Sequence, residues 1–178
     1  MNVSMARTAS QRNPDALPGA VRFLQWIIRL LSAMPESLVA FIARFSIAAT
    51  FWKSGQTKVE GFAVDLVEGQ FAFGIPRLAD SAVALFRDEY RLPVVSPELA
   101  AVLAAVAEHA LPVLLLFGLA TRFSALGLLV MTAVIQVLVY PGAWPTHGVW
   151  AAVLLYLVAN GPGVVSIDAR VARRVRPA

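Results

Sequence analysis

Four long apolar segments constrain what this chain can fold into more than any other feature. They run over residues 36–57, 98–117, 122–140 and 146–160. A helix rises about 1.5 Å per residue, so about 20 residues cross roughly 30 Å of hydrocarbon, and each segment is near the minimum for that. The chain is 58% hydrophobic and 15% charged, against about half and a quarter in a soluble domain. The sequence therefore predicts an all-α integral membrane protein, a bundle of four transmembrane helices within residues 36–160.

Proline and glycine mark the ends of these segments. Pro35 precedes the first segment, and Ser96 followed by Pro97 offers the second an N-cap and a first helical residue. The second and third segments meet in a tight turn over residues 118–122, and a Gly-Pro-Gly run from Gly161 ends the fourth. The connections are short enough to join antiparallel neighbouring helices.

The chain before the first span divides into two parts. Residues 1–17 are polar and have no apolar pattern, which predicts a disordered N-terminus. Residues 18–34 place polar side chains, among them Arg22 and Arg29, on one helical face and aliphatic side chains on the other. This pattern predicts an amphipathic helix lying in the membrane interface. Two alternatives stay open: a signal peptide, and a fifth span that would carry both arginines at a few kcal/mol each.

The distribution of arginine predicts the orientation. The first 35 residues contain four arginines, residues 161–178 contain four more, and the turn between the second and third spans contains Arg122. Four spans place these regions on one side of the membrane, and the positive-inside rule makes that side cytoplasmic. We therefore expect a multi-pass protein of the inner (plasma) membrane with both termini cytoplasmic and residues 161–178 forming a basic tail.

The long loop between the first two spans carries one recognisable helical pattern. Residues 77–90 place Leu78, Val83 and Phe86 on one side of a helix and charged residues on the other. This pattern predicts an outer loop helix lying over the mouth of the bundle. Residues 59–75 are too short to span a membrane and too rich in glycine for an assignment.

Two charges inside the spans are candidates for a buried site, because ionisable groups in a membrane are costly. Arg44 lies roughly 12 Å and Glu108 roughly 13 Å from the cytoplasmic side, at 1.5 Å per residue. The matching depths predict an Arg44–Glu108 ion pair, which either contributes to a binding site or only fixes the register of the helices. The neighbouring His109 either binds a ligand or hydrogen-bonds an adjacent helix, and the sequence favours the second.

A second polar layer is expected near the outer ends of the spans. Lys53, Gln136 and His147 fall there, together with several aromatic residues that suit either a cavity or an interfacial belt. Lys53 could instead extend its amine to the interface, whereas the amide of Gln136 requires a partner inside an apolar helix.

Several kinds of chemistry find no support in the sequence. The absence of cysteine excludes disulfides, thiolate metal sites and covalent haem attachment. His109 and His147 differ in depth, which argues against a haem between them, and no metal site is expected. The net charge of +4 is explained by topology, and nucleic acid is not an expected partner.

Several short motifs resemble those of the DoxX family of small bacterial membrane proteins. In chain order they are SGQTK (54–58), LFRDEYRLP (85–93), AEHALPVLLLFGLATR (107–122), VIQVLVYP (134–141), the pair Trp144 and His147, and GPGVVSID (161–168). Arg44 fits the same pattern. The resemblance implies a four-helix membrane protein. It also implies an association with oxidoreductase assemblies, which in this family include thiosulfate:quinone oxidoreductase subunits.

We therefore expect an accessory or anchoring subunit of a membrane oxidoreductase system rather than a stand-alone enzyme. The expected partners are membrane lipid, a protein of a redox complex and a second copy of the chain. In an alternative interpretation, the bundle binds quinone or another small apolar ligand. The candidate ligand-binding residues are Arg44, Lys53, Glu108, His109, Gln136 and His147. A small-molecule transporter is the third interpretation and is the least favoured, because no inverted repeat is visible.

Overall fold

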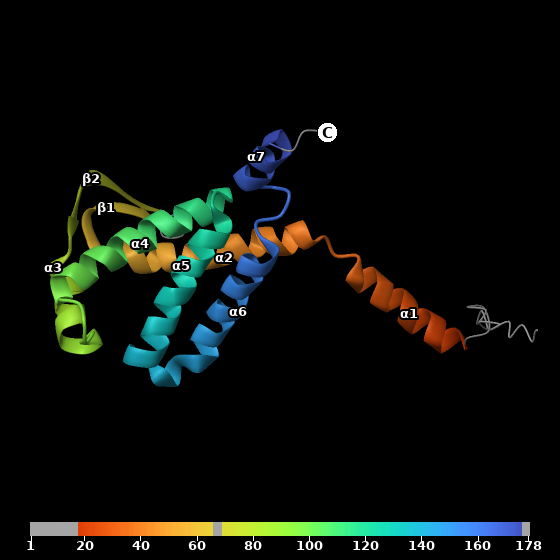
Figure 1. Cartoon of the computed structure of the whole chain (residues 1–178), viewed down its shortest axis with the longest axis horizontal. Helices are drawn as coiled ribbons and strands as arrows, with labels where there is room; N and C mark the ends of the chain where they lie inside the picture. Colours follow the sequence, from red (N-terminus) through yellow and green to blue (C-terminus); the bar gives the residue numbers. More distant parts are fainter. Residues whose placement is uncertain (1–17, 66–68, 176–178) are drawn as a thin grey trace, which may run out of the picture. The chain divides into compact units, whose positions relative to one another are not determined.

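The computed structural model describes residues 18–65 and 69–175 and is 74% helical (Figure 1). It contains one small antiparallel sheet, so the prediction of an all-α fold was wrong in this detail. The chain forms two compact units, which divide after Pro35. The predicted disordered segment, residues 1–17, lies outside the described residues.

The described part of the first unit is the single helix α1 (Gly19–Ser32). Its side chains divide strongly into a polar and an apolar face, and none of them is buried. Large apolar residues such as Phe23 and Leu31 are exposed, and the Arg29 side chain donates to the carbonyl of Gln25 (3.3 Å). The helix expected from the sequence is therefore present, and its location in the membrane interface remains a prediction.

Four long helices form the main part of the second unit. They are α2 (Glu36–Gln56), α4 (Pro97–Phe117), α5 (Thr121–Val134), continued by the π-helical turn η3 (Ile135–Val139), and α6 (Trp144–Asn160). Helix α2 packs against α4 and α6, and α5 packs against the same two helices, so the four contacts form a ring. The helix bounds agree with the four predicted segments to within a few residues.

Three helical segments among the described residues are long and apolar enough to cross a membrane. They cover Pro97–Phe117, Thr121–Val139 and Pro141–Asn160. Helix α2 passes the same test only together with α1, as one interrupted span. Its two internal cations, Arg44 and Lys53, lower its apolar character, so three to four spans are supported.

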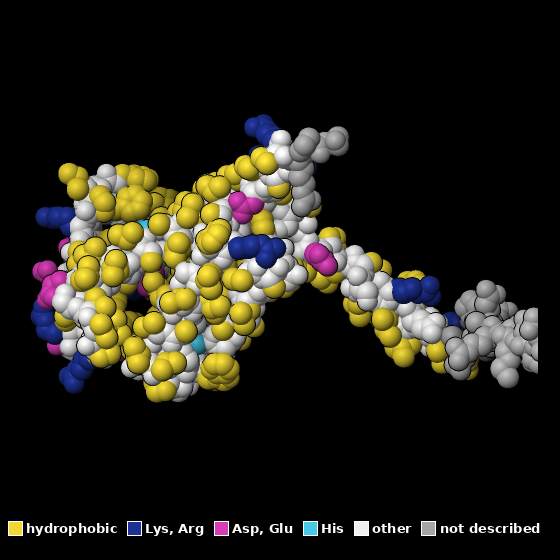
Figure 2. Space-filling model, viewed as in Figure 1, with side chains coloured by type: hydrophobic (Ala, Val, Ile, Leu, Met, Phe, Trp, Pro, Cys, Tyr) yellow, Lys and Arg dark blue, Asp and Glu magenta, His cyan; other side chains and the backbone are white. Residues whose placement is uncertain are grey.

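The four helices bury small and aliphatic side chains and expose large apolar ones. Leu115, Leu128, Leu154 and Leu157 are fully buried at their centre, whereas residues such as Phe123 are largely exposed. Figure 2 shows hydrophobic side chains over the visible surface of α4–α6 and charged side chains gathered toward the two ends of this unit. An apolar surface of this extent indicates a lipid environment.

The start of α4 and its end follow their sequence signals. The Ser96 hydroxyl accepts a hydrogen bond from the backbone N–H of Leu99 (3.3 Å), and Pro97 is the first helical residue. Gly118 ends the helix with φ of +65°, and a Cβ there would lie 2.6 Å from a guanidinium nitrogen of Arg44. The positive φ and the lack of space for a Cβ both explain why glycine occupies position 118.

The loop between α2 and α4 folds into a hairpin and a short helical cap. Strands β1 (Val59–Asp65) and β2 (Gln70–Leu78) pair antiparallel with an irregularity between Glu60 and Phe62. Helix α3 (Asp80–Ala84) and the π-helical turn η2 (Leu85–Tyr90) follow and pack on the first half of α4. The predicted helix over 77–90 therefore begins only at Asp80, because the preceding residues complete β2. The chain ends in α7 (Ile167–Val175).

Candidate functional site

A buried ion pair joins the turn after α2 to the middle of α4. The Lys58 amine lies 2.8 Å from a carboxylate oxygen of Glu108, and both side chains are only 4% exposed. The same amine donates to the hydroxyl of Ser54 (3.2 Å), and the Lys58 carbonyl accepts from the backbone N–H of Ala79 (2.9 Å). The pair is thus covered by the segment that leads from β2 into α3.

The predicted Arg44–Glu108 ion pair is wrong. The Arg44 guanidinium instead donates to the carbonyls of Leu115 (3.2 Å), Leu116 (3.1 Å) and Val165 (2.6 Å). The last carbonyls of a helix have no partner within that helix, and a guanidinium with five N–H donors can bond several of them at once. The expected matching depths were also wrong, because Glu108 packs beside Gly55 near the end of α2, whereas the Arg44 guanidinium lies beside Gly118 at the end of α4.

Sequence reasoning missed Lys58 as a site residue. It was included in the SGQTK motif and otherwise counted as a loop charge, because it lies just beyond the predicted end of the first span. The available signal was the need of Glu108 for a cation, since a carboxylate inside an apolar helix is strongly disfavoured without one.

His109 is held by two hydrogen bonds that fix its tautomer. The side-chain nitrogen of Gln56 can only donate, so Nε2 of His109 accepts (2.8 Å), and Nδ1–H donates to the carbonyl of Ala105 (2.7 Å). The Gln56 oxygen accepts from the backbone N–H of Val64 in β1 (2.7 Å). The expected hydrogen bond to an adjacent helix is therefore present, and it continues into the hairpin.

Close approach of α2 and α4 makes this arrangement possible. A Cβ on Gly55 would lie 2.9 Å from Cε1 of His109 and 3.0 Å from the carbonyl oxygen of Glu108. The Trp52 ring lies 5.1 Å from the imidazole, and its indole N–H donates to the Val64 carbonyl (3.0 Å). The histidine ring is therefore fixed by α2, α4 and β1 together.

An apolar groove of about 580 Å³ lies beside His109. Its walls come from α2, β1 and α4, and its lining residues are Trp52, Phe62, Val106, His109, Ala110, Val113 and Leu114. His109 is the one ionisable side chain in this lining. A groove with aromatic and aliphatic walls suits a flat apolar molecule.

Of the polar layer predicted near the ends of the spans, Gln136 and His147 are brought together. The Gln136 oxygen accepts from Nδ1–H of His147 (2.8 Å), and its amide donates to the carbonyl of Pro141 (2.7 Å). The partner that Gln136 requires is thus on the next helix, and His147 is buried. Lys53 lies on α2 and is exposed, so its side chain does not share this buried position.

Tyrosines connect the helical cap to the end of η3. The Tyr140 hydroxyl donates to the carboxylate of Glu89, and the Tyr90 and Tyr140 rings meet edge to face at 5.8 Å. Burial raises the pKa of Tyr90, and the negative charges of Glu108 and Glu89 raise it further. Tyr90 is therefore a neutral side chain. Within the described chain, no cluster of three or more histidine and carboxylate side chains could hold a metal ion.

The apolar outer surface and the buried polar pairs together define a multi-pass helical membrane protein. A family model described as DoxX matches residues 39–141, which is more than half of the chain, and the chain belongs to the DoxX family. The resemblance found in the sequence motifs is thereby confirmed. The comparison with curated proteins returned no match, and neither did that with solved structures.

Proposed function

We propose that this DoxX-family chain is an accessory subunit of a membrane oxidoreductase system. The association of the family with such assemblies supports this role. The buried charges support an accessory role over a catalytic one, because Lys58 is bonded to Glu108 and Arg44 is bonded to three backbone carbonyls. Charges that are paired in this way stabilise the packing of helices and are not poised to react.

The proposal places α2, α4, α5 and α6 across the plasma membrane as a four-helix bundle. The ring of contacts among these helices and their exposed apolar surfaces support four spans. The start of α2, the α4–α5 turn and the end of α6 meet at one end, because Arg44, Ser37 and Asp168 bond across them. The arginine-rich segments adjoin this end, which supports a cytoplasmic location for it.

The contribution that the geometry supports best is to hold a quinone-type molecule in the groove beside His109. This groove is the observation that carries the proposal. Trp52 and Phe62 offer faces for a flat ring, the aliphatic residues of α4 accept an apolar tail, and the imidazole of His109, whose two nitrogens are bonded to Gln56 and Ala105, adds a third ring to the lining. The groove lies on the outside of α4, so a lipid-soluble molecule can enter it from the bilayer.

The test compares the wild-type chain with Ala110→Phe, which fills the groove, and with Leu103→Phe as a matched control on exposed α4 surface. Each chain is purified from its native membrane in mild detergent, and the quinone per chain is measured after solvent extraction. We expect quinone with the wild-type and L103F chains and at least tenfold less with A110F. Equal amounts of quinone in all three chains would refute the groove as the quinone site.

The accessory role has its own readout in the same preparations. After mild crosslinking in the membrane, we expect an oxidoreductase chain to be crosslinked to all three variants. Quinone bound without any oxidoreductase chain would leave the ligand site standing and would contradict the accessory role.

A further inference from the structure

Helix α7 is anchored to the bundle by its first turn. The two carboxylate oxygens of Asp168 accept from the backbone N–H groups of Ala120 (2.8 Å) and Thr121 (2.9 Å), at the start of α5. The Asp168 N–H donates to the carbonyl of Gly118 (2.9 Å). A carboxylate is a favourable cap for the positive end of a helix, so these three bonds fix the start of α7 at the α4–α5 turn.

The segment that leads into α7 is bonded to the same end of the bundle. The Val165 carbonyl accepts from the buried guanidinium of Arg44 (2.6 Å), and the Val164 N–H donates to the hydroxyl of Ser37 (3.2 Å). These contacts hold the start of α7 level with the ends of the apolar helices. In the proposed membrane placement, that level is the headgroup region.

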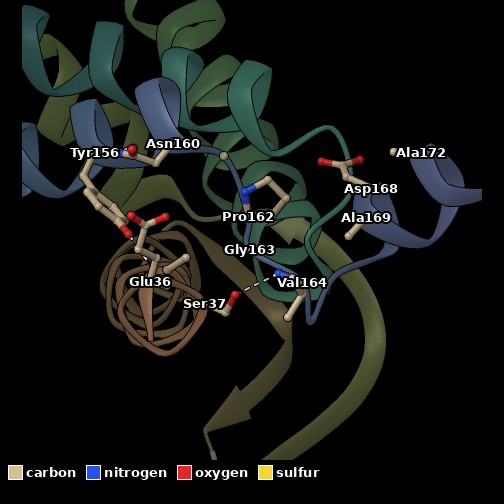
Figure 3. A pocket seen from close by; sticks show the side chains of 12 residues that line it. Glu36, Ser37, Tyr156, Asn160, Pro162, Gly163, Val164, Asp168, Ala169 and Ala172 are labelled. Carbon is tan, nitrogen blue, oxygen red and sulfur yellow. Dashed lines mark hydrogen bonds between the residues drawn. The ribbon is translucent and has the colours of Figure 1, made fainter. Parts of the chain in front are cut away.

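Beyond its first turn, α7 has little support from the rest of the unit. A cavity of about 390 Å³ separates its small residues Ala169 and Ala172 from the start of α2 and the end of α6. Figure 3 shows Glu36 and Tyr156 on one side of this cavity and Ala169 and Ala172 on the other, with the Pro162–Val164 segment between them. All residues from 170 to 175 are exposed.

The exposed part of α7 is strongly amphipathic. Val171 and Val175 are 51% and 72% exposed and follow one another by one helical turn, and Val164 and Val165 in the segment before α7 are exposed as well. Arg170, Arg173 and Arg174 occupy the other side of the helix. A helix with one valine face and one arginine face complements the boundary between lipid tails and anionic headgroups.

We propose that α7 docks on anionic phospholipid and that this docking stabilises the bundle through Asp168. The valines enter the interface, and the arginines bind lipid phosphates. Because Asp168 bonds α7 to the first residues of α5, ordering α7 on lipid also orders the α4–α5 turn. The inference rests on the proposed membrane placement of the helices, but it does not depend on the quinone groove or on an oxidoreductase partner. The family match ends at residue 141, so α7 lies outside it.

The test measures the thermal unfolding of the full chain in detergent with added phosphatidylglycerol or phosphatidylcholine. For the wild-type chain we expect a midpoint roughly 6–12 °C higher with phosphatidylglycerol, from three arginines near an anionic surface. The variant R170Q/R173Q/R174Q should lose this difference. The control R77Q/R87Q/R91Q removes three exposed arginines from the opposite end and should keep it. Equal midpoints in the two lipids for the wild-type chain, or a full difference in the α7 variant, would overturn the docking.

Asp168→Asn tests the coupling separately. An asparagine side chain has one acceptor oxygen and can satisfy only one of the two N–H groups of α5. We expect this variant to retain as much phosphatidylglycerol per chain as the wild type, measured by native mass spectrometry, and to gain less than half of the stabilisation. A full gain in stability would contradict the role of Asp168, and loss of the bound lipid would show that Asp168 serves lipid binding itself.

Discussion

Breaking the Lys58–Glu108 pair from either side should destabilise the fold strongly. The amine and the carboxylate are 2.8 Å apart and 4% exposed, so removing one leaves the other buried without an ionic partner. Such single removals cost about 3–5 kcal/mol, because the remaining charge keeps its desolvation penalty. We therefore expect a loss of about that size in the free energy of unfolding for Lys58→Met and for Glu108→Gln.

Removing both charges together should cost far less than the sum of the two single changes. Apolar replacement of a buried pair is often neutral or stabilising. The double variant K58M/E108L is therefore expected within about 1–2 kcal/mol of the wild type, which gives a coupling energy of several kcal/mol between the two positions. Neither residue lines the groove beside His109, so the double variant should retain quinone binding.

The assay is reversible unfolding in mixed micelles with a rising fraction of denaturing detergent, followed by circular dichroism. The matched control is Arg87→Gln, which breaks the exposed pair with Glu98 (3.2 Å, side chains 57% and 62% exposed) and should cost less than about 1 kcal/mol. Single changes at Lys58 or Glu108 that cost no more than this control would refute the reasoning. They would mean that water reaches the pair.

Three further changes test other contacts. Gly55→Ala places a Cβ 2.9 Å from His109, so we expect a loss of about 1–3 kcal/mol in unfolding free energy and weaker quinone binding in the same preparation. Arg44→Lys keeps the charge but cannot reach three carbonyls at once, and detergent unfolding should show a loss of about 1.5–3 kcal/mol; no loss would disprove the role of its hydrogen bonds. Gln136→Leu leaves the buried His147 without its partner, and we expect a loss of about 1–3 kcal/mol in the free energy of unfolding. The double variant Q136L/H147F removes both polar groups and should lose almost none of this free energy.

The apolar segments predicted the helices well, because a membrane span has to satisfy its backbone within itself and therefore follows length and apolar character closely. The start of α4 followed from Ser96 and Pro97 for a similarly local reason. The hairpin of β1 and β2 was not predicted. Its strand pairing depends on contacts between residues distant in sequence, and the glycines at 61 and 74 hid the pattern.

The residues that make buried polar contacts were predicted, but their pairing was predicted only in part. Glu108, His109, Gln136 and His147 lie in polar contacts, as their cost in an apolar helix requires. Depths counted from the predicted helix ends could not identify their partners, because neighbouring helices need not end at the same level and a depth does not give the rotation of a helix. Arg44 illustrates this, since it bonds the carbonyls of Leu115 and Leu116 at the end of α4, whereas Glu108 lies beside Gly55.

The most direct test of the proposed function is quinone binding by the purified chain. A short-chain quinone analogue is titrated against the wild-type, A110F and L103F chains in detergent, and quenching of tryptophan fluorescence is followed, with Trp52 as the reporter in the groove. We expect saturable quenching for the wild-type and L103F chains and at least tenfold weaker binding for A110F, a loss of about 1.4 kcal/mol. Equal titration curves for A110F and the wild type would contradict the assignment of the groove as the ligand site.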